Sequence, residues 1–443
     1  MTRLIRILAL IVLAASCGRP SSYEYVDSFP GIFPDYVGVT IPDSVADLQF
    51  RMEDRSCFEA SRERVGDTVY VRVRSWNKGE KTGREYKPFP IFISHDPIDP
   101  YIAYRLIEPG YESWSYITLN QRELSSYKES VMVDNKVNGG GCLNCHSFDA
   151  GNPGRMLFHA RGKGGGTVFI DGDSVRLRNL SAERPHKQGV YPAWHPDGRY
   201  IVFSSNATHQ AFSFADGQPI EVYDDSSDLI LVDTATDSIT VPASLGRGDV
   251  LETFPSWSSD GGTLYYCAAS AAGKMPESRA NLHYNLMAID FRDGTFVGEP
   301  RTVFSADGLS VSFPRACGNY LLFTVSAYAT FPIWHREADL WLLDLRTGEA
   351  SPASVLNSPD TESYHSWSSN GRWIVFSSRR LDGRYTRLFL AHFDGEGNFG
   401  KPWLLPQKDP EHNLLRLRSY NVPEFITGKV QDRRRAISKL FGR

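Results

Sequence analysis

Two cysteines and a histidine form the most reactive short segment of this chain. Cys142, Cys145 and His146 stand in the order Cys-Leu-Asn-Cys-His. Two thiols at this spacing can form thioethers with the two vinyl groups of a haem, and the adjacent histidine can ligate the iron from one side. The spacing therefore predicts a covalent c-type haem, with these three residues as its attachment and first axial ligand.

A second axial ligand is expected a few residues further along. Met156 and His159 are three positions apart in Met-Leu-Phe-His-Ala-Arg, a run typical of a strand. Side chains three apart on a strand point to opposite faces, so only one of the two reaches the iron. We favour His159, because Met156 suits the filling of a core. His186 and His195 are further candidates.

The carboxylates of a haem also need partners. Arginine binds carboxylates with two parallel hydrogen bonds. Arg161 is the expected partner of the propionates, together with Arg155 and Lys163.

Two other interpretations of the Cys-x-x-Cys-His segment stay open. A structural zinc ion needs four ligands, and no second Cys/His pair follows at zinc-finger spacing. A redox dithiol of thioredoxin type opens a helix after a strand. Here three glycines precede Cys142, and a loop-like run follows His146. Both alternatives therefore fit the segment less well than haem.

Covalent haem requires export across a membrane, and the N-terminus has the features of an export signal. Arg3 and Arg6 precede an apolar run, Ile7 to Ala15, of the length found in signal peptides. We predict a signal peptide over residues 1–16. The run Leu13-Ala-Ala-Ser-Cys17 resembles a bacterial lipobox. Ordinary secretion, with cleavage near Ser16, is the alternative.

The lipobox resemblance implies an anchored protein. Cys17 would carry the lipids, and residues 17–22 would form a polar tether. Several acyl chains bind a membrane firmly, at about 0.8 kcal/mol per buried CH₂. We therefore expect a location in the bacterial cell envelope, on the periplasm-facing side of the outer membrane. The net charge of −4 gives no basis for nucleic-acid binding.

The second half of the chain repeats itself. Each copy has an aromatic residue, a tryptophan, an Asp-Gly or Asn-Gly pair and then an alternating apolar run, which predicts a tight hairpin. Another strand and an outer strand follow each copy. Four strands in each unit of about 50–60 residues are typical of a β-propeller blade, with the tryptophans packed between blades. The copies begin at Tyr191, Phe254 and Tyr364, and a degraded copy begins at Phe313.

These copies resemble the TolB-type propeller repeat, also called PD40 or WD40-like. The resemblance implies an all-β, TolB-like β-propeller over residues 154–425, with five to six blades. Five units can be recognised, the first of them over residues 154–181 without a tryptophan. The sixth would come from the N-terminal half or from residues 414–425. TolB-type propellers are similar to modules that dock other envelope proteins.

The rest of the chain shows no repeat. We predict a β-rich N-terminal domain over residues 23–138, ending in a helix over residues 121–133. Residues 139–153 would form a haem-attachment loop between this domain and the propeller. Residues 426–443 would form a basic C-terminal tail in solvent.

Two functions follow from these expectations. The first is an envelope lipoprotein with covalent haem c, which transfers electrons or senses through the haem while its propeller docks a partner. Its redox partner is not indicated. The alternative is a non-redox, protein-binding propeller scaffold. No Gly-x-Ser-x-Gly segment of a serine hydrolase occurs. Peroxidase-type activity would require an open position on the iron.

Overall fold

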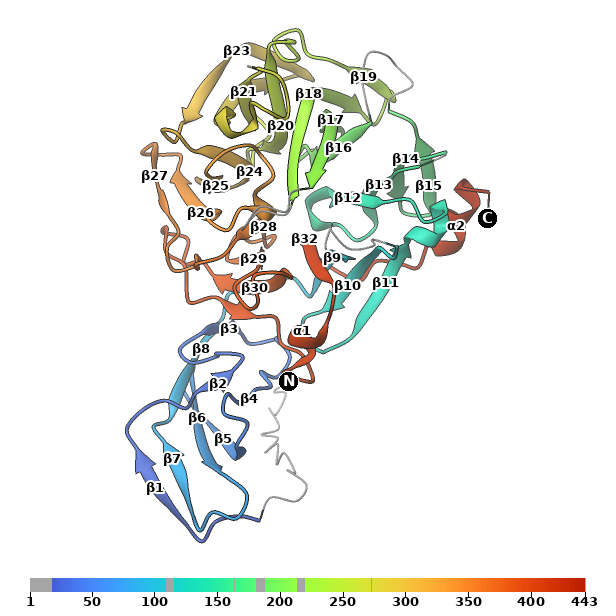
Figure 1. The fold of residues 1–443 in the computed structure, drawn as a ribbon. Coiled ribbons are helices and arrows are strands. Elements are labelled where there is room, and N and C mark those ends of the chain that lie inside the picture. Colours follow the sequence, from blue (N-terminus) through green and yellow to red (C-terminus); the bar gives the residue numbers. More distant parts are fainter. Residues whose placement is uncertain are drawn as a thin grey trace.

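The computed structural model describes residues 18–108, 115–162, 164–180, 188–212, 220–271 and 273–442. The predicted signal peptide and the lipidation site Cys17 lie outside these ranges, as do Lys163 and His186. Figure 1 shows a large propeller with a small β domain attached to its side.

Five blades follow one another along the chain. Each is a four-stranded antiparallel sheet in which consecutive strands are neighbours, the first strand being innermost. This is the topology that the repeats predict. The strands are β12 (Leu143–Phe148), β13 (Arg155–Ala160), β14 (Gly166–Asp171) and β15 (Ser174–Arg178) in blade 1; β16 (Gly189–Trp194), β17 (Tyr200–Phe212), β18 (Ile220–Asp233) and β19 (Ser238–Thr240) in blade 2; β20 (Val250–Trp257), β21 (Thr263–Ser270), β22 (Asn285–Arg292) and β23 (Thr295–Phe304) in blade 3; β24 (Ser310–Cys317), β25 (Tyr320–Ser326), β26 (Asp339–Asp344) and β27 (Glu349–Pro352) in blade 4; and β28 (Glu362–Trp367), β29 (Trp373–Ser378), β30 (Arg387–His392) and β31 (Trp403–Leu404) in blade 5.

The sixth blade closes the ring with strands from both halves of the chain. Its inner strand is β32 (Ser419–Ile426), which pairs with β9 (Tyr101–Ile107). The strands β10 (Thr118–Glu123) and β11 (Glu129–Asp134) complete the sheet. The ring is therefore a six-bladed propeller, which settles the predicted five to six blades.

This closure corrects two predictions. Residues 101–134 belong to the propeller, so the N-terminal domain ends near residue 100 rather than at residue 138. The helix predicted over residues 121–133 is instead a hairpin of β10 and β11, whose turn spans residues 124–127. The pairing of β10 with β9 satisfies the backbone along the whole strand and overrides the local helical periodicity.

The N-terminal domain is a separate small β structure. Its main sheet has the order β1-β7-β6-β8-β3, with β5 also paired to β6, and a two-stranded sheet is formed by β2 and β4. These strands are β1 (Ser22–Val26), β2 (Ile32–Phe33), β3 (Thr40–Pro42), β4 (Arg51–Met52), β5 (Cys57–Val65), β6 (Thr68–Trp76), β7 (Thr82–Tyr86) and β8 (Phe89–Ser94).

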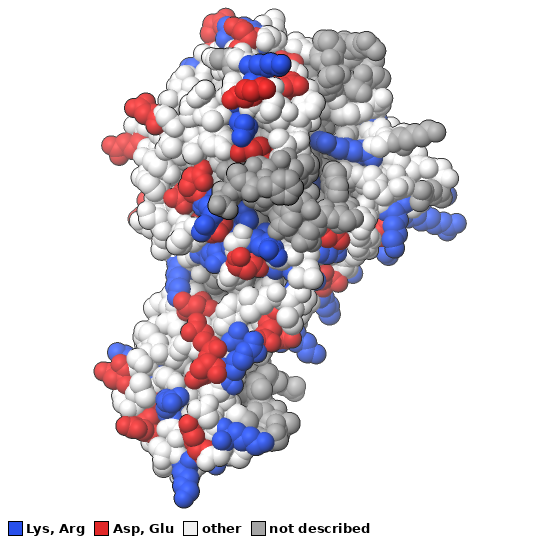
Figure 2. Space-filling view, in the orientation of Figure 1, with Lys and Arg blue, Asp and Glu red and all other residues white. Residues whose placement is uncertain are grey.

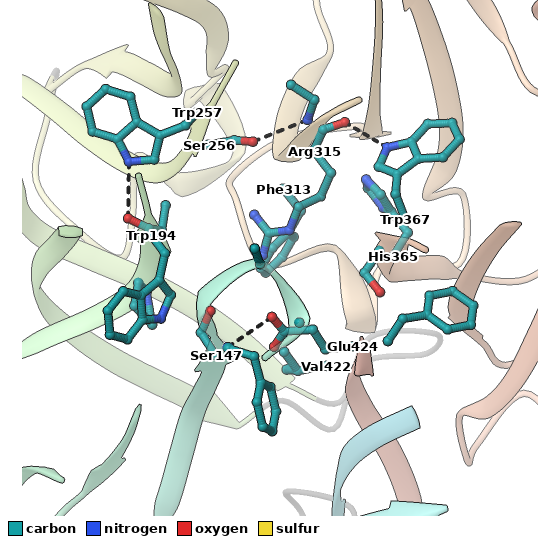
Figure 3. A pocket seen from close by; sticks show the side chains of 18 of the residues that line it. Ser147, Trp194, Ser256, Trp257, Phe313, Arg315, His365, Trp367, Val422 and Glu424 are labelled. Carbon is teal, nitrogen blue, oxygen red and sulfur yellow. Dashed lines mark hydrogen bonds between the residues drawn. The ribbon is translucent and has the colours of Figure 1, made fainter. Parts of the chain in front are cut away.

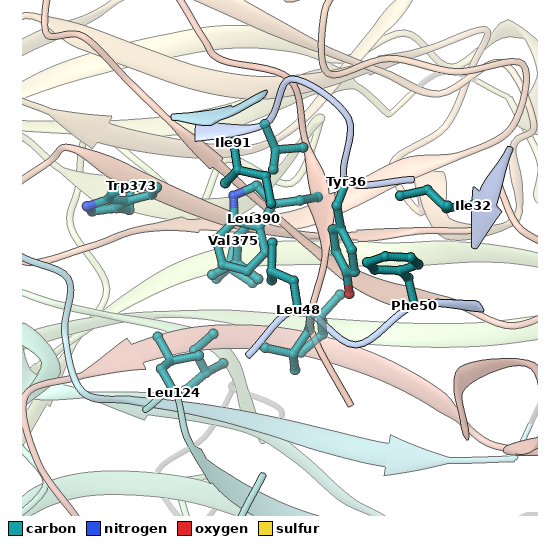
Figure 4. Packing of buried hydrophobic residues seen from close by; sticks show 14 of the residues in the cluster. Ile32, Tyr36, Leu48, Phe50, Ile91, Leu124, Trp373, Val375 and Leu390 are labelled. Atoms are coloured by element: carbon teal, nitrogen blue, oxygen red, sulfur yellow. The ribbon is translucent and has the colours of Figure 1, made fainter. Parts of the chain in front are cut away.

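A shared apolar core joins this domain to blade 5. Figure 4 shows Tyr36 and Ile91 of the domain packed beside Val375 and Leu390 of the blade. The Tyr36 hydroxyl also donates to the Leu404 carbonyl at 3.3 Å. The domain is thus held against the propeller by buried apolar surface.

Two predicted boundaries next to the propeller also change. Residues 143–148 of the expected haem loop form β12, the innermost strand of blade 1, because the propeller needs an inner strand there. The basic tail is not free in solvent. Its helix α2 (Arg434–Leu440) buries Ile437 in the core that lines blade 1. The remaining short elements are η1 (Asn135–Asn138), η2 (Asp149–Gly151), η3 (Arg279–Asn281), η4 (Pro332–Trp334) and α1 (His412–Leu415).

Acidic and basic side chains are interspersed over the face shown in Figure 2. Among the described residues, no helix is long and apolar enough to cross a membrane.

Candidate functional site

The same backbone device occurs in all six inner strands. Each strand pairing is interrupted by a bulge, and each bulge contains one non-glycine residue with a φ between 43° and 53°. Such a conformation is uncommon for large side chains and is kept only where the surrounding structure enforces it. The six residues, in blade order, are Cys145, Tyr191, Phe254, Phe313, Tyr364 and Val422.

This equivalence places the cysteine-histidine pair within the repeat. Cys145-His146-Ser147-Phe148 of blade 1 corresponds to Tyr364-His365-Ser366-Trp367 of blade 5. The second half of the predicted haem motif is therefore also the inner-strand segment of a propeller blade.

The four aromatic residues at the bulges form one cluster at the centre of the propeller. Ring centroids are 4.4 Å apart for Tyr191 and Phe254, 3.9 Å for Phe254 and Phe313, and 4.7 Å for Phe313 and Tyr364. Cys145 and Val422 complete the ring of six positions with small side chains. Burial raises the pKa of the Cys145 thiol, so it is protonated in this setting.

A cavity of about 520 Å³ opens beside this cluster and is lined by residues from all six inner strands. The volume lies within the range of ligand and cofactor pockets. Trp257 and Trp367 line it, and their indole N–H groups donate to Ala193 and Arg315 carbonyls of the preceding blades. These contacts confirm that the repeat tryptophans pack between blades. Figure 3 shows the arrangement.

Three histidines line the cavity, and they differ in how their nitrogens are satisfied. His195 is bonded at both, with Nε2 at 3.1 Å from the Gly261 carbonyl and Nδ1 at 2.8 Å from Asp197. His365 is bonded at Nε2, 2.9 Å from the Leu322 carbonyl, while its Nδ1 has no partner among the described residues.

His146 is the extreme case. Its side chain is only 2% exposed, and neither ring nitrogen has a hydrogen bond of normal geometry within the described ranges, although a contact with the Val422 backbone acts to raise its pKa. Burial, and to a lesser extent the guanidinium of Arg105, lowers the pKa of His146 to about 3. The imidazole is therefore neutral at physiological pH, which is the form that ligates a metal. Buried polar atoms without partners are costly and call for an explanation.

The three residues of the predicted haem motif are close in sequence but differ in setting. Cys145 and His146 line the central cavity. Cys142 lies just before β12 and is half-buried against the core beside blade 1. Both cysteines are free thiols. A thiol and a neutral imidazole therefore share the wall of this cavity, whereas Cys142 is not among the residues that line it.

The structure does not bring Met156 or His159 to this cavity. Met156 is buried on the face of β13 that packs with Phe148 and Leu143. His159 points to the other face, where Nδ1 is 3.4 Å from the Thr167 hydroxyl. The predicted opposition of these two side chains is therefore observed, but His159 lines a second cavity of about 450 Å³.

The arginines predicted to bind the haem propionates also lie outside the lining of the central cavity. Arg161 lines the second cavity beside His159. Arg155 pairs with Asp149 at 2.7 Å and stacks on the Trp194 ring. The zinc interpretation gains no support, since no group of three or more His, Cys, Asp or Glu side chains within the described residues is arranged to hold a metal ion.

Sequence reasoning missed the four charged residues that line the cavity, which are Asp99, Arg105, Arg315 and Glu424. In each bulge, the residue with a positive φ is followed by a histidine or a proline. In every blade, the side chain of the next residue lines the cavity. Four are small and two are charged. In blade order they are Ser147, Ala193, Ser256, Arg315, Ser366 and Glu424. The departure of Arg315 from the small residue, serine or alanine, of the other copies was the available indication.

Comparisons with known proteins place no further constraint on this site. No family model matches the chain, and no curated protein is significantly similar. Among solved structures, an oligogalacturonate lyase in complex with manganese is 11% identical, with a TM-score of 0.40 over 69% of this chain and 73% of that one. The oligogalacturonate lyase of Vibrio parahaemolyticus is 11% identical, with a TM-score of 0.39 over 80% and 85%. Puromycin hydrolase is 13% identical, with a TM-score of 0.37 over 87% and 58%. Likeness at this level carries no argument about activity.

Proposed function

We propose that this protein is an envelope lipoprotein in which a six-bladed propeller holds a covalent c-type haem at its central cavity. Cys142 and Cys145 would form the thioethers, and His146 would be the axial ligand. The observation that carries the proposal is the buried His146 imidazole, which makes only a loose contact with the Val422 backbone and lies inside a Cys-x-x-Cys-His segment.

The site favours the neutral, unbonded imidazole that an iron requires. His146 is buried, and the aromatic cluster of the bulge residues lies beside the same cavity. Apolar surroundings of this kind control solvent access and reduction potential at a haem. When bound, the haem supplies one-electron chemistry, and the protein would supply attachment, burial and a docking surface for the redox partner.

Export and anchoring are part of the same proposal. The predicted signal peptide and an acylated Cys17 would place the protein in the bacterial cell envelope, on the periplasm-facing side of the outer membrane, where c-type haem can be attached. Envelope proteins would dock on the propeller.

The direct test is covalent haem retention. The full chain would be exported in a host that matures c-type cytochromes, and haem would be detected on a denaturing gel and by absorbance. We expect haem in the wild type and in the control Cys267→Ala/Cys317→Ala, which removes two free thiols outside the motif. We expect none in Cys142→Ala/Cys145→Ala. A wild type without haem would exclude the proposal.

One observation favours a second function, the non-redox binding scaffold. Cys145 and His146 occupy a standard inner-strand position, and blade 5 carries a histidine there without any cysteine. In that account the cavity binds a partner or ligand without iron. It predicts a haem-free wild type, and a Cys142→Ala/Cys145→Ala variant with unchanged binding.

A further inference from the structure

Arg315 is the feature of the cavity that neither the repeat nor the haem motif explains. It replaces the small residue found at the equivalent position of four blades. Burial lowers the pKa of its guanidinium, so the position disfavours a charge. Burying a charged group without a partner is costly, and a serine here would avoid that cost.

The guanidinium has few partners inside the protein. Its one side-chain hydrogen bond goes to the carbonyl of the adjacent Pro314 at 3.1 Å, and it forms no ion pair with an acid in the described part of the chain. Arginine has five N–H donors in a planar arrangement. Most of them are therefore available to a group inside the cavity.

The backbone that presents Arg315 is held by both neighbouring blades. Its carbonyl accepts the Trp367 indole N–H at 3.0 Å from blade 5. The next residue, Ala316, donates its N–H to the Ser256 hydroxyl of blade 3 at 3.3 Å. Figure 3 shows the Arg315 side chain extending from this position into the middle of the cavity. The donors are thus presented from a fixed base.

Glu424 is the other charged residue of the ring, and it does not neutralise Arg315 by direct contact. Its carboxylate accepts the Phe148 N–H at 3.1 Å. Burial raises the pKa of Glu424 to about 7, so this carboxyl is only partly ionised near neutral pH. Arg315 and Glu424 attract each other across the cavity without a direct bond, so a carboxylate beside the apolar walls of Trp257, Trp367 and Phe313 would supply the contact that Arg315 lacks.

We infer that Arg315 is the anchor of a carboxylate-binding site in the central cavity, which accepts a carboxylate attached to an apolar body. Two sources have this chemistry, a propionate of the proposed haem and a free organic acid. The site is defined by this chain's own residues, so it stands whether or not haem is attached.

The test uses a matched pair of probes, benzoate and its neutral analogue benzamide. Binding to the full-length, haem-free Cys142→Ala/Cys145→Ala protein would be measured by calorimetric titration. Because a hydrogen bond to a charged group contributes about 1.5–3 kcal/mol, benzoate should bind at least about tenfold more tightly than benzamide. Arg315→Ser restores the small residue of the other blades and should remove this preference, whereas Arg315→Lys should keep part of it.

Controls separate the site from general charge and folding. Arg301→Ser removes an exposed arginine paired with Asp290 on blade 3 and should leave benzoate binding unchanged. Circular dichroism would verify that each variant is folded. Equal affinity for the two probes, or benzoate binding that persists in a folded Arg315→Ser variant, would overturn the inference.

The same titration on haem-loaded wild-type protein then shows whether the carboxylate at Arg315 comes from a haem propionate or from a free acid. If a propionate occupies Arg315, benzoate binding is lost in this form; if the ligand is a free acid, it is retained. A protein that never acquires haem would refute the proposed function and leave the benzoate test of Arg315 intact.

Discussion

Blades 1 and 5 have equivalent inner-strand segments, but the side chains of the two segments make different contacts. In blade 5, Tyr364 packs in the central aromatic cluster, His365 bonds to the Leu322 carbonyl, and Trp367 bonds to the Arg315 carbonyl. These three side chains serve the packing of neighbouring blades. The segment is therefore explained by the fold.

Blade 1 has the same bulge without these contacts. Cys145 replaces the aromatic residue, and among the described residues His146 has no hydrogen bond of normal geometry, only a loose contact with the Val422 backbone. Phe148 stands where blade 5 has Trp367, and it has no indole N–H to donate. Blade 1 therefore lacks packing and hydrogen bonds at positions where the repeat supplies both in blade 5. Local departures of this kind are typical of a functional site.

The largest expected difference concerns the bulge residues themselves. Tyr364→Ala removes a ring from the central cluster and should lower the free energy of unfolding by about 3–5 kcal/mol. Cys145→Ala removes one sulfur atom and should cost about 1 kcal/mol. Denaturant unfolding of both variants measures this, with Cys267→Ala as a second buried-thiol control. Equal losses of unfolding free energy in Tyr364→Ala and Cys145→Ala would show that the two bulge residues contribute equally to packing, contrary to this account.

A pH dependence is expected at Glu424, which bonds to the backbone of blade 1. Burial raises its pKa from 4.5 to about 7. The folded protein then holds this proton more tightly than the unfolded chain, so the contribution favours folding at low pH and is lost as the pH rises from 4.5 to about 7.

Glu424→Gln should remove that loss. The variant should gain about 3 kcal/mol relative to wild type between pH 4.5 and pH 7. Unfolding curves at a series of pH values measure the difference, with the exposed Glu299→Gln as a control. A difference that does not change with pH would show that Glu424 ionises normally.

A smaller effect separates the two histidines in the haem-free Cys142→Ala/Cys145→Ala protein. His365→Ala loses the hydrogen bond to Leu322 in addition to packing, whereas His146→Ala loses only a loose contact with the Val422 backbone. We expect His365→Ala to be more destabilising by about 1 kcal/mol. Thermal unfolding of the two variants compares them directly. The reverse order would mean that His146 has a structural partner.

The smallest expected effect is at Met156 and His159, the residues that the sequence predicts as second axial ligands of the haem. Met156 and His159 do not line the central cavity. Met156→Leu and His159→Ala should therefore leave the absorbance of a haem-loaded protein unchanged. A new high-spin spectrum in either variant would place that residue on the iron.

Much of the propeller could be predicted, because the residues that specify each blade lie close together in the sequence. The Trp-Ser-x-Asp-Gly copies each specify a strand, a turn and a second strand within a few residues. The sixth blade could not be assembled in the same way. It pairs Tyr420 with Leu106, more than 300 residues apart, and nothing in the spacing of either strand identifies the other. The false helix over residues 121–133 arose because the Leu124 and Tyr127 spacing belongs to a turn.

The site was predictable in part for a related reason. The Cys-x-x-Cys-His spacing is visible without a structure, but its place in blade 1 is not. Blade 1 lacks both the tryptophan and the Asp-Gly pair, so the match of His146-Ser147 to His365-Ser366 is too short to align. Arg315 was hidden in the degraded copy, and only the shared cavity shows that it faces the same space as His146.

In this proposal His146 ligates iron, whereas His365 is bonded to the Leu322 carbonyl and ligates nothing. The most direct measurement is the absorbance spectrum of exported, matured wild-type protein beside His146→Gln and His365→Gln. We expect haem in all three, the same spectrum in wild type and His365→Gln, and a changed axial-ligand spectrum in His146→Gln alone. A wild type without haem, or a His146→Gln spectrum identical to that of wild type, would contradict the account.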